Sequence, residues 1–377
     1  MYKLKDFAQD ISVAIKDVQS SPFDRFVGLE HYDSGEPVIT RYTDKSLLSS
    51  SVKEFRKNDI LIARRNVYLK RAGIAFFDGL TSGDSIVLRV YDDCESRTGI
   101  SKQDAIRIIP FILNSNVFWA YANKHADGMN SKRISKEMLY DYEFDLPPLA
   151  EQKVLAEKLW AAYRLKESYK KLLAATEEMV KSQFIEMFGN PVTNNKGWNT
   201  LPIKDVAPET SSLEKQTGKV WILNLDMIES NTGKVVEKVF ENDSNLLSVA
   251  PFDEGNVLYS KLRPYLNKVV IPDGKGYATT ELVPLRPNQK LLNLTFFSHL
   301  LRGDDFVTYA NSISTGTKMP RMPLNDLRKF QCILPPMEKQ NEFEEIAHQA
   351  DKSGSGGRES VALMDKVKKS LINYYNI

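Results

Sequence analysis

Two kinds of hydrophobic pattern alternate along the chain and predict a protein that mixes strands and helices. Short runs of aliphatic and β-branched residues, punctuated by Gly and Pro, are typical of strands at 59–63, 85–90 and 256–260. Longer stretches near 108–124 and 294–310 have a helical pattern. The pattern therefore predicts an α+β fold in which each half of the chain forms a mixed α/β domain.

A much longer helix is predicted from Ala150 to about Phe188, where the sequence contains neither Gly nor Pro. At 1.5 Å per residue this helix would be roughly 57 Å long. Gly189-Asn190-Pro191 ends it. Apolar or small residues recur in it mostly at steps of three and four, at Leu155, Leu159, Ala162, Tyr169, Leu172, Thr176, Met179 and Met187. This spacing predicts an amphipathic helix of the coiled-coil kind.

The chain contains an internal repeat. Residues 118–152 align with residues 306–340 at a constant offset of 188, and 11 of the 35 positions are identical. The clearest match is Leu-Pro-Pro-x-x-x-Gln, which occurs at 146–152 and again at 334–340. Weaker matches with other offsets lie upstream, such as 55–62 with 252–259. Two copies of one fold with different loops are therefore expected.

The repeat places a second long helix at 338–377, interrupted at 353–357. Three glycines in Gly354-Ser355-Gly356-Gly357 would cost roughly 3 kcal/mol inside a helix. The composition favours an engineered linker, and a natural hinge stays open as the alternative. Two long helices of equal length predict antiparallel pairing and a pseudo-twofold arrangement. The alternative is that each helix packs only on its own domain.

The predicted organisation has four parts. The first domain spans 1–149 and is followed by the first long helix at 150–188. The second domain spans 189–337 and is followed by the second long helix at 338–377.

Composition places the chain among ordinary soluble proteins, with 42% hydrophobic and 27% charged residues. No apolar run is long enough to cross a bilayer, and the N-terminus lacks the apolar core of a signal peptide. Cys94 and Cys332 are the only cysteines, which favours a reducing cytoplasm. The net charge of +2 is only weak evidence about partners, because positive charge can gather on one face.

Sequence motifs for catalysis or cofactor binding are missing. Neither a G-x-x-x-x-G-K-[ST] nor a G-x-G-x-x-G motif occurs, and the four histidines show no metal-ligand spacing. Asp84 and the pair Asp304-Asp305 show no partner pattern. Asp273 with Glu281 resembles part of a nuclease carboxylate set, but the lysine that should follow is absent. We therefore expect no catalytic residue, no bound cofactor and no metal.

Basic clusters recur at related places in both halves, next to the first shared strand and next to a shared glycine. On loops held by a strand, Arg and Lys can contact phosphates and base edges, and aromatic rings can stack or pack against sugars. The alternative for any one of them is a solvated positive loop. The residues predicted to contact DNA are Arg64, Arg65, Tyr68, Lys70, Arg71, Lys132, Arg133, Lys261, Arg263, Tyr265, Lys268, Lys318 and Arg321.

The Leu-Pro-Pro-x-x-x-Gln junction followed by a long helix, twice in one chain, resembles the specificity subunit of type I restriction-modification systems. Residues 312–322, with Gly316, look like that family's glycine-containing loop before its last strand. The resemblance covers essentially the whole chain. Only the glycine-rich segment at 354–357 departs from it, which puts a continuous second helix and its docking of partners in doubt.

The resemblance implies two target-recognition domains, each reading one half of a bipartite DNA site, and paired helices that set the spacer. It also implies double-stranded DNA, two modification (methyltransferase) subunits and a motor-nuclease restriction subunit as partners. S-adenosylmethionine and ATP would then belong to those partners. The alternative function is a non-enzymatic scaffold that binds proteins through two repeated domains. A third hypothesis is an enzyme with an unrecognised active site.

Overall fold

The computed structural model describes residues 1–11, 13–15, 17–18, 20–47, 52–129, 131–209, 217–242 and 249–375. The chain divides into two compact units. Unit 1 comprises Met1–Tyr169 with Glu359–Ile377, and unit 2 comprises Lys170–Arg358. The two long helices, α6 (Leu149–Phe188) and α11 (Met337–Tyr374), each contribute one segment to each unit.

In its described residues, unit 1 has twelve short strands and several helices before α6. Its elements are β1 (Tyr2–Lys3), α1 (Leu4–Phe7), β2 (Ala8–Asp10), β3 (Ala14–Ile15), β4 (Arg25–Val27), η1 (Leu29–His31), β5 (Val38–Ile39), β6 (Thr43–Asp44), η2 (Lys45–Leu47), β7 (Val52–Phe55), β8 (Ile60–Ala63), η3 (Val67–Leu69), β9 (Ala72–Ala75), β10 (Gly79–Ser82), β11 (Ser85–Val90), α2 (Cys94–Thr98), α3 (Lys102–Ile112), α4 (Asn116–His125), α5 (Lys136–Tyr140) and β12 (Glu143–Phe144).

Unit 2 repeats most of this order within its described residues. Its elements between the long helices are β13 (Thr200–Pro202), α7 (Ile203–Val206), β14 (Lys219–Leu223), η4 (Leu225–Met227), β15 (Val239–Asn242), β16 (Val249–Phe252), β17 (Val257–Ser260), η6 (Pro264–Leu266), β18 (Val269–Val270), β19 (Gly276–Thr279), β20 (Leu282–Leu285), α8 (Leu294–Arg302), α9 (Asp304–Ser312), α10 (Leu324–Lys329) and β21 (Gln331–Ile333).

The strands that the two units share have the same order in their sheets, which supports the repeat found in the sequence. In unit 1 the order β7-β10-β4-β6 matches β16-β19-β14-β15 of unit 2, and β11-β8-β9 matches β20-β17-β18. The register agrees as well, because Ile62 faces Ile86 in unit 1 and Tyr259 faces Val283 in unit 2. From β7 to β11 the two copies are therefore related by an offset of 197.

Glycine is required at one equivalent position in each unit. It lies where two parallel strands approach closely, β4 and β10 in unit 1 and β14 and β19 in unit 2. A Cβ on Gly79 would lie 2.7 Å from the Arg25 carbonyl oxygen, and one on Gly276 would lie 2.6 Å from the Trp221 carbonyl oxygen. A phenylalanine ring closes the other side of each glycine. Neither position has room for a side chain.

Two of the hydrophobic clusters of each unit lie on opposite faces of the sheet that contains β8 in unit 1 and β17 in unit 2. Along β8, Ile60 and Ile62 point to the core formed with α3 and α4, whereas Leu61 points to the core between the two sheets. In unit 2, Val257 and Leu258 divide in the same way. The helices therefore cover one face of the sheet that contains β8 or β17. The sheet that contains β10 or β19 covers the other face.

The junction motif begins each long helix in the same way. The Gln152 side chain donates from Nε2 to the carbonyl oxygen of Pro147 at 2.7 Å, and Gln340 donates to Pro335 at 2.7 Å. Both glutamines are buried. This bond ties the first turn of the helix to the proline that precedes it, which explains why the spacing is preserved in both copies.

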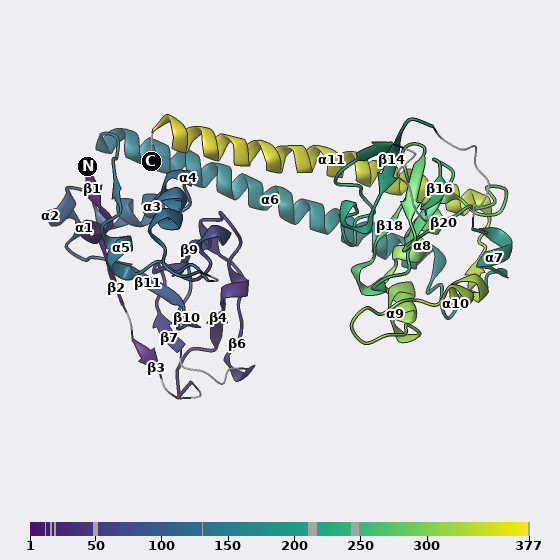
Figure 1. The fold of residues 1–377 in the computed structure, drawn as a ribbon, viewed down its shortest axis with the longest axis horizontal. Coiled ribbons are helices and arrows are strands. Elements are labelled where there is room, and N and C mark those ends of the chain that lie inside the picture. The colour runs from purple at the N-terminus through teal and green to yellow at the C-terminus, as the bar shows by residue number, and fades with distance from the viewer. Residues whose placement is uncertain are drawn as a thin grey trace. The chain divides into compact units, whose positions relative to one another are not determined.

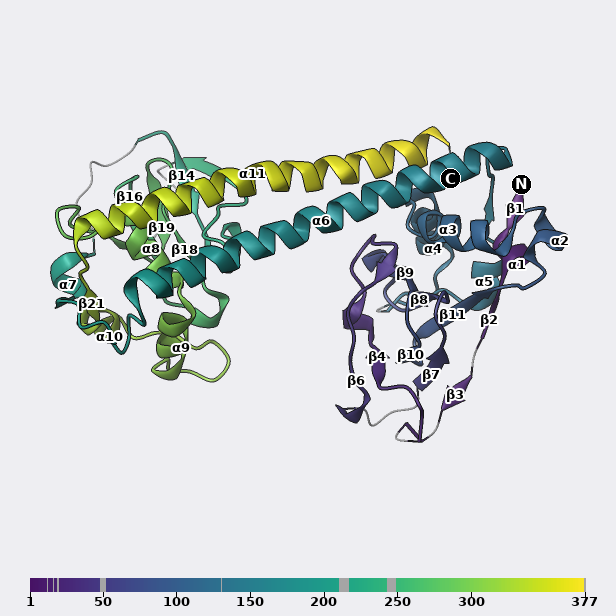
Figure 2. The same cartoon turned by 180° about the vertical axis from the view of Figure 1, so that it is seen from behind.

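The two long helices run antiparallel within each unit, as Figures 1 and 2 show. In unit 2 the rings of Phe184 on α6 and Phe343 on α11 make an edge contact with centroids 5.3 Å apart. In unit 1, Lys166 on α6 donates to Asp365 on α11 at 2.6 Å, and Ile372 joins the core that contains Leu155. Both helices therefore contribute to the core of both units.

Three sequence-based expectations about helices were wrong. The stretch predicted near 108–124 is two helices, α3 and α4, because Ser115 caps α4 by accepting a bond from the Phe118 amide. The stretch at 294–310 is likewise divided, between α8 and α9 at Gly303. The interruption predicted at 353–357 is absent, since α11 is continuous from Met337 to Tyr374.

The reason for the continuity of α11 is its packing. Position 357 lies against Leu173 of α6, so close that a Cβ there would be 3.0 Å from Leu173 Cδ2. Helices in folded proteins are stabilised mainly by such packing, and it outweighs the low helix propensity of glycine here. Among the described residues, the helices are all too short or too polar to cross a membrane.

Candidate nucleic-acid interface

The predicted basic residues of unit 1 come together where two loops meet. The loop after β8 carries Arg64 and Arg65, and the loop after α4 carries Lys132 and Arg133. Backbone bonds join them: the Asn66 amide donates to the Lys132 carbonyl at 2.7 Å, and the Ile134 amide donates to the Arg64 carbonyl at 3.0 Å. Residues almost 70 positions apart in sequence therefore form one surface.

Three arginines of this surface share one carboxylate. Asp84, in the turn before β11, lies 3.5 Å from Arg64 Nε, 3.5 Å from Arg65 Nη1 and 3.8 Å from Arg133 Nη2. Arg65 also donates from Nε to Ser131 Oγ at 2.9 Å. The three guanidinium groups outnumber the single carboxylate, so the surface remains positive while the side chains are held in place.

An exposed tyrosine stands beside these arginines on the short helix η3. Tyr68 is 59% exposed. Left-handed residues bound the helix on both sides, Asn66 at φ 55° and Lys70 at φ 50°. Lys70 donates to Asn116 Oδ1 at 3.1 Å, and no such bond holds the ring of Tyr68 among the described contacts. The ring is therefore available to pack on a ligand.

Unit 2 builds the same surface from the equivalent segments. The Arg263 amide donates to the Pro320 carbonyl at 2.7 Å, which joins the loop after β17 to the loop that contains Gly316. Glu281 takes the place of Asp84 and lies 2.9 Å from Arg321 Nη2. Tyr265 is 50% exposed on η6.

The glycine of each second loop has the same backbone conformation. Gly128 has φ 111° and Gly316 has φ 98°, values that side chains rarely adopt. Each glycine turns its loop back so that Arg133 pairs with Asp127, and Arg321 with Thr315, as isolated β-bridges. The repeated glycine thus positions the repeated arginine.

Two of the predicted residues hold the fold instead of facing outward. Arg71 donates to the carbonyl oxygens of Leu29 and Arg65, both at 2.9 Å. Its counterpart Lys268 donates to the Leu225 carbonyl at 2.6 Å. Partial burial lowers the pKa of Arg71. In unit 1 this cation ties the start of β9 to the segment after β4. In unit 2 it ties the start of β18 to the segment after β14.

The remaining predicted residues of unit 2 stand closer to solvent. Lys318 is exposed in the loop that contains Gly316, and Lys261 is partly exposed at the end of β17. Arg263 has a left-handed backbone at φ 48°, and its Nε atom is buried without a hydrogen-bond partner among the described residues. Contact of any of these residues with DNA stays a prediction.

Sequence reasoning missed the two acidic residues at the centre of these surfaces. Asp84 showed no partner pattern in the sequence, and Glu281 was considered only as part of a nuclease set. The structure pairs Asp84 with arginines from two separate loops, and among the described residues it pairs Glu281 with Arg321. Their shared offset of 197, the same as that of the neighbouring strands, is the signal that could have identified them.

Among the described residues, no three His, Cys, Asp or Glu side chains are arranged to hold a metal ion. Cys94 and Cys332 are both buried and free, and burial raises the pKa of each thiol. A buried thiol of raised pKa is a poor nucleophile.

Comparison with known proteins gives a family match in the second half. Residues 195–355 match the model of the type I restriction modification DNA specificity domain. Over 189 residues, 48% of this chain, the sequence is 26% identical to the type I restriction enzyme EcoDI specificity subunit of Escherichia coli. That match covers 41% of the relative, so the chain spans well under two thirds of its length.

Two solved structures share the fold across nearly the whole chain. One is the S subunit of a type I restriction-modification system from M. genitalium, with a TM-score of 0.57, 11% identity and coverage of 98% of this chain and 94% of that one. The other is a chain from a study of complex assembly in the type I R-M system, with a TM-score of 0.51, 16% identity and coverage of 99% and 98%. These likenesses show the fold, and the family match adds the specificity domain. The resemblance seen in the sequence is confirmed: the fold is shared across nearly the whole chain, and residues 195–355 match the specificity domain.

Proposed function

We propose that the chain is a DNA-reading subunit without a catalytic site of its own, in which each unit recognises one half of a bipartite site. The observation that supports this proposal is a positive surface built twice on one frame with different side chains. Arg65, Asn66 and Lys70 of unit 1 are replaced at the equivalent places by Leu262, Arg263 and Asn267 of unit 2.

Different side chains on the same frame fit the reading of two different half-sites. Arginine donates two parallel hydrogen bonds to guanine, and asparagine pairs in the same way with adenine. Exchanging these residues while keeping the backbone changes which bases are favoured. Asp84 and Glu281 would restrict how the arginines turn, so that fewer rotamers are lost on binding.

The long helices have two proposed roles. Because α6 and α11 belong to both units, they are suited to set the spacer between the half-sites. They are also proposed to dock two methyltransferase subunits, with a motor-nuclease subunit joining for restriction. S-adenosylmethionine and ATP would be bound by those partners, and the complex would act in the cytoplasm.

The decisive experiment maps methylated sites by sequencing, with the chain co-expressed with its methyltransferase partners. We expect Arg133→Gln to relax specificity in one half of the site only, and Arg321→Gln to relax the other half only. Each lost bidentate contact should cost about 1–3 kcal/mol of discrimination. Lys102→Gln and Lys290→Gln, which remove exposed cations elsewhere in units 1 and 2, should leave the site unchanged.

If either arginine variant altered both halves of the site together, independent reading by the two units would be wrong. The scaffold alternative is separated by salt. Binding that neutralises several phosphates weakens steeply as salt rises, whereas a protein-binding scaffold has no such affinity for DNA. Methyl transfer by the purified chain alone would contradict a non-catalytic role.

A further inference from the structure

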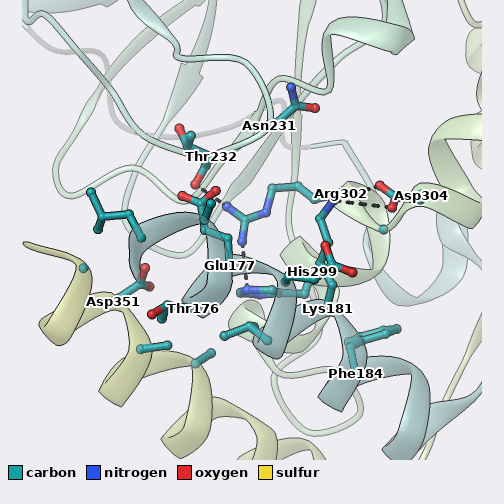
Figure 3. Close-up of a pocket in the computed structure, with 18 of the residues that line it drawn as sticks. Thr176, Glu177, Lys181, Phe184, Asn231, Thr232, His299, Arg302, Asp304 and Asp351 are labelled. Atoms are coloured by element: carbon teal, nitrogen blue, oxygen red, sulfur yellow. Dashed lines mark hydrogen bonds and ion pairs between the residues drawn. The ribbon is translucent and has the colours of Figure 1, made fainter. Parts of the chain in front are cut away.

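Unit 2 contains a cavity that the DNA-reading surface does not use. Its volume is about 410 Å³, in the range of small-molecule sites, and it lies among α6, α8, α11 and residues 231–234 (Figure 3). Val180 and Phe184 of α6 and Ala347 of α11 form an apolar wall. Arg302 and His299 extend into it from α8, as Figure 3 shows.

The guanidinium of Arg302 meets only neutral acceptors. It donates from Nη1 to the Thr232 carbonyl at 2.5 Å and from Nη2 to His299 Nε2 at 2.8 Å. His299 accepts that bond because its Nδ1 donates to the Thr295 carbonyl at 2.8 Å, which leaves Nε2 unprotonated. Among the described residues, no carboxylate oxygen forms an ion pair with Arg302 within 4 Å.

At the position equivalent to this cavity, unit 1 has a cation with two carboxylate partners. There the cation is Lys166, which pairs with the carboxylates of both Glu36 and Asp365. An offset of 188 relates Lys166 to Gly354 and Asp365 to Glu177. The missing side chain at Gly354 therefore leaves open in unit 2 a volume that Lys166 fills in unit 1.

The partner that unit 2 lacks is the counterpart of Glu36. Gly35 and Asn231 occupy equivalent positions, because the amide of Gly35 donates to the Lys70 carbonyl at 2.8 Å and that of Asn231 to Asn267 at 3.1 Å. The next residue is Glu36 in unit 1 and Thr232 in unit 2. Unit 2 therefore has a cation here, Arg302 on α8, but lacks a counterpart of the Glu36 carboxylate.

We propose that this cavity binds the carboxylate group of an organic ligand whose body is apolar. The carboxylate takes the place of the absent acidic side chain and accepts from the remaining donors of Arg302. The apolar body lies against Val180, Phe184 and Ala347. A buried cation is stabilised by a paired, hydrogen-bonded anion, and this ligand supplies one.

The other charges at the cavity agree with an anionic ligand. Lys234 and Arg358 line it together with Arg302, and burial lowers the pKa of both Lys234 and Arg302. Five carboxylates also line the cavity, but Glu177, Glu178, Asp304 and Asp351 are exposed, whereas Lys234, Arg302 and Arg358 are partly buried. Lys181 and Asp304, which also line the cavity, neutralise each other at 3.1 Å. This inference does not depend on DNA reading.

The test uses calorimetric titration of the full chain with three matched probes, 4-phenylbutyrate, 4-phenylbutylamine and 4-phenylbutanol. We expect the carboxylate to bind at least about tenfold more tightly than the amine or the alcohol, the effect of one charged hydrogen bond. Equal or tighter binding of the amine would show that Glu177 and Asp351 make this a cation site, and would overturn the proposal. No binding by any probe would also overturn it.

Two variants locate the site on these residues. Lys234→Gln removes one cation, and Thr232→Glu restores within the chain the carboxylate that unit 1 has. Each should weaken 4-phenylbutyrate about tenfold, whereas Lys290→Gln, an exposed lysine elsewhere in unit 2, should not. Melting curves identify any variant that fails to fold. Unchanged affinity in both folded variants would place the bound probe elsewhere and refute the assignment.

The carboxylate has two possible sources, a small molecule or an acidic side chain of a partner subunit. Titrating the chain and the assembled complex with the same probe distinguishes them. Binding retained in the complex identifies a small-molecule site. Binding present in the free chain and lost in the complex identifies an acidic side chain docked in the cavity.

Discussion

The two units of the molecule share a frame and differ in how they balance buried charge. In unit 1 a cation on α6 meets two carboxylates, one from a loop and one from α11. In unit 2 the cation is on α8 and meets a backbone carbonyl and a neutral histidine. The strand order, the essential glycines and the proline-led helix starts are the same in both.

The comparison shows which structural features the two copies share and which differ between them. Backbone geometry is preserved, because a glycine at a parallel-strand contact or a glutamine at a helix start has no substitute of the same shape. Side chains that face loops and cavities changed between the copies. Both the proposed DNA-reading surfaces and the proposed carboxylate cavity belong to this second class.

Removing the buried cation of each unit should give the largest contrast. Lys166→Met leaves Glu36 and Asp365 without their shared partner, so we expect unit 1 to lose about 4 kcal/mol of stability. Arg302→Met leaves two neutral acceptors and no carboxylate within ion-pair distance, so unit 2 should lose only about 2 kcal/mol. Urea unfolding with hydrogen exchange resolved by segment measures both.

Adding Glu36→Gln to Lys166→Met should recover part of the loss, because one uncompensated charge is removed. If the two single variants cost the same, the charge balance of the two units would not differ as described.

The shared frame should fail in the same way in both units when its glycine is replaced. Gly79→Val and Gly276→Val each force a side chain against a backbone oxygen and a phenylalanine ring. We expect each to cost about 3 kcal/mol and to raise hydrogen exchange in its own unit. Gly274→Val, where nothing lies within 4 Å of the added carbon, is the control in unit 2. A loss in only one unit would mean that the frames are less alike than their strand order indicates.

Acid should weaken unit 2 through His299. Burial and the adjacent Arg302 lower the pKa of His299 from 6.5 to about 3. The unfolded chain therefore takes up a proton below about pH 6.5 that the native state does not, and stability falls as the pH drops from there. We expect about 2 kcal/mol to be lost by pH 5. In His299→Gln, which keeps an acceptor for Arg302, this part of the slope should disappear; an unchanged slope would assign the loss to other groups.

Much of the fold was predictable from sequence because it depends on local and repeated patterns. The strand at 85–90 and the start of α6 were found within a residue of their observed bounds, and the duplicated junction led to the family. The helix breaks at Ser115 and Gly303 were missed, because a single cap or glycine leaves the apolar spacing intact. Both breaks needed the three-dimensional contacts to be seen.

The sites were predicted less completely because their residues meet through tertiary structure. Arg65 and Arg133 were each identified, but the carboxylate of Asp84 between them was not. The cavity of unit 2 was not predicted at all. Arg302 and His299 lie three residues apart on one helix, but Thr232 and Gly354 reach them only when the chain folds.

The smallest expected effect concerns the glycines of α11, where the sequence predicted a break and the structure has a helix. Alanine in a helix is favoured over glycine by about 1 kcal/mol. At Gly356 nothing lies within 4 Å of an added carbon, so Gly356→Ala should gain nearly that amount. At Gly357 the added carbon would lie 3.0 Å from Leu173 Cδ2, so Gly357→Ala must first displace that side chain and should gain less. Helicity by circular dichroism and urea midpoints of the full chain measure the difference. If α11 were interrupted here, neither substitution would raise the stability, because alanine has no such advantage outside a helix. That result would support the predicted interruption at 353–357.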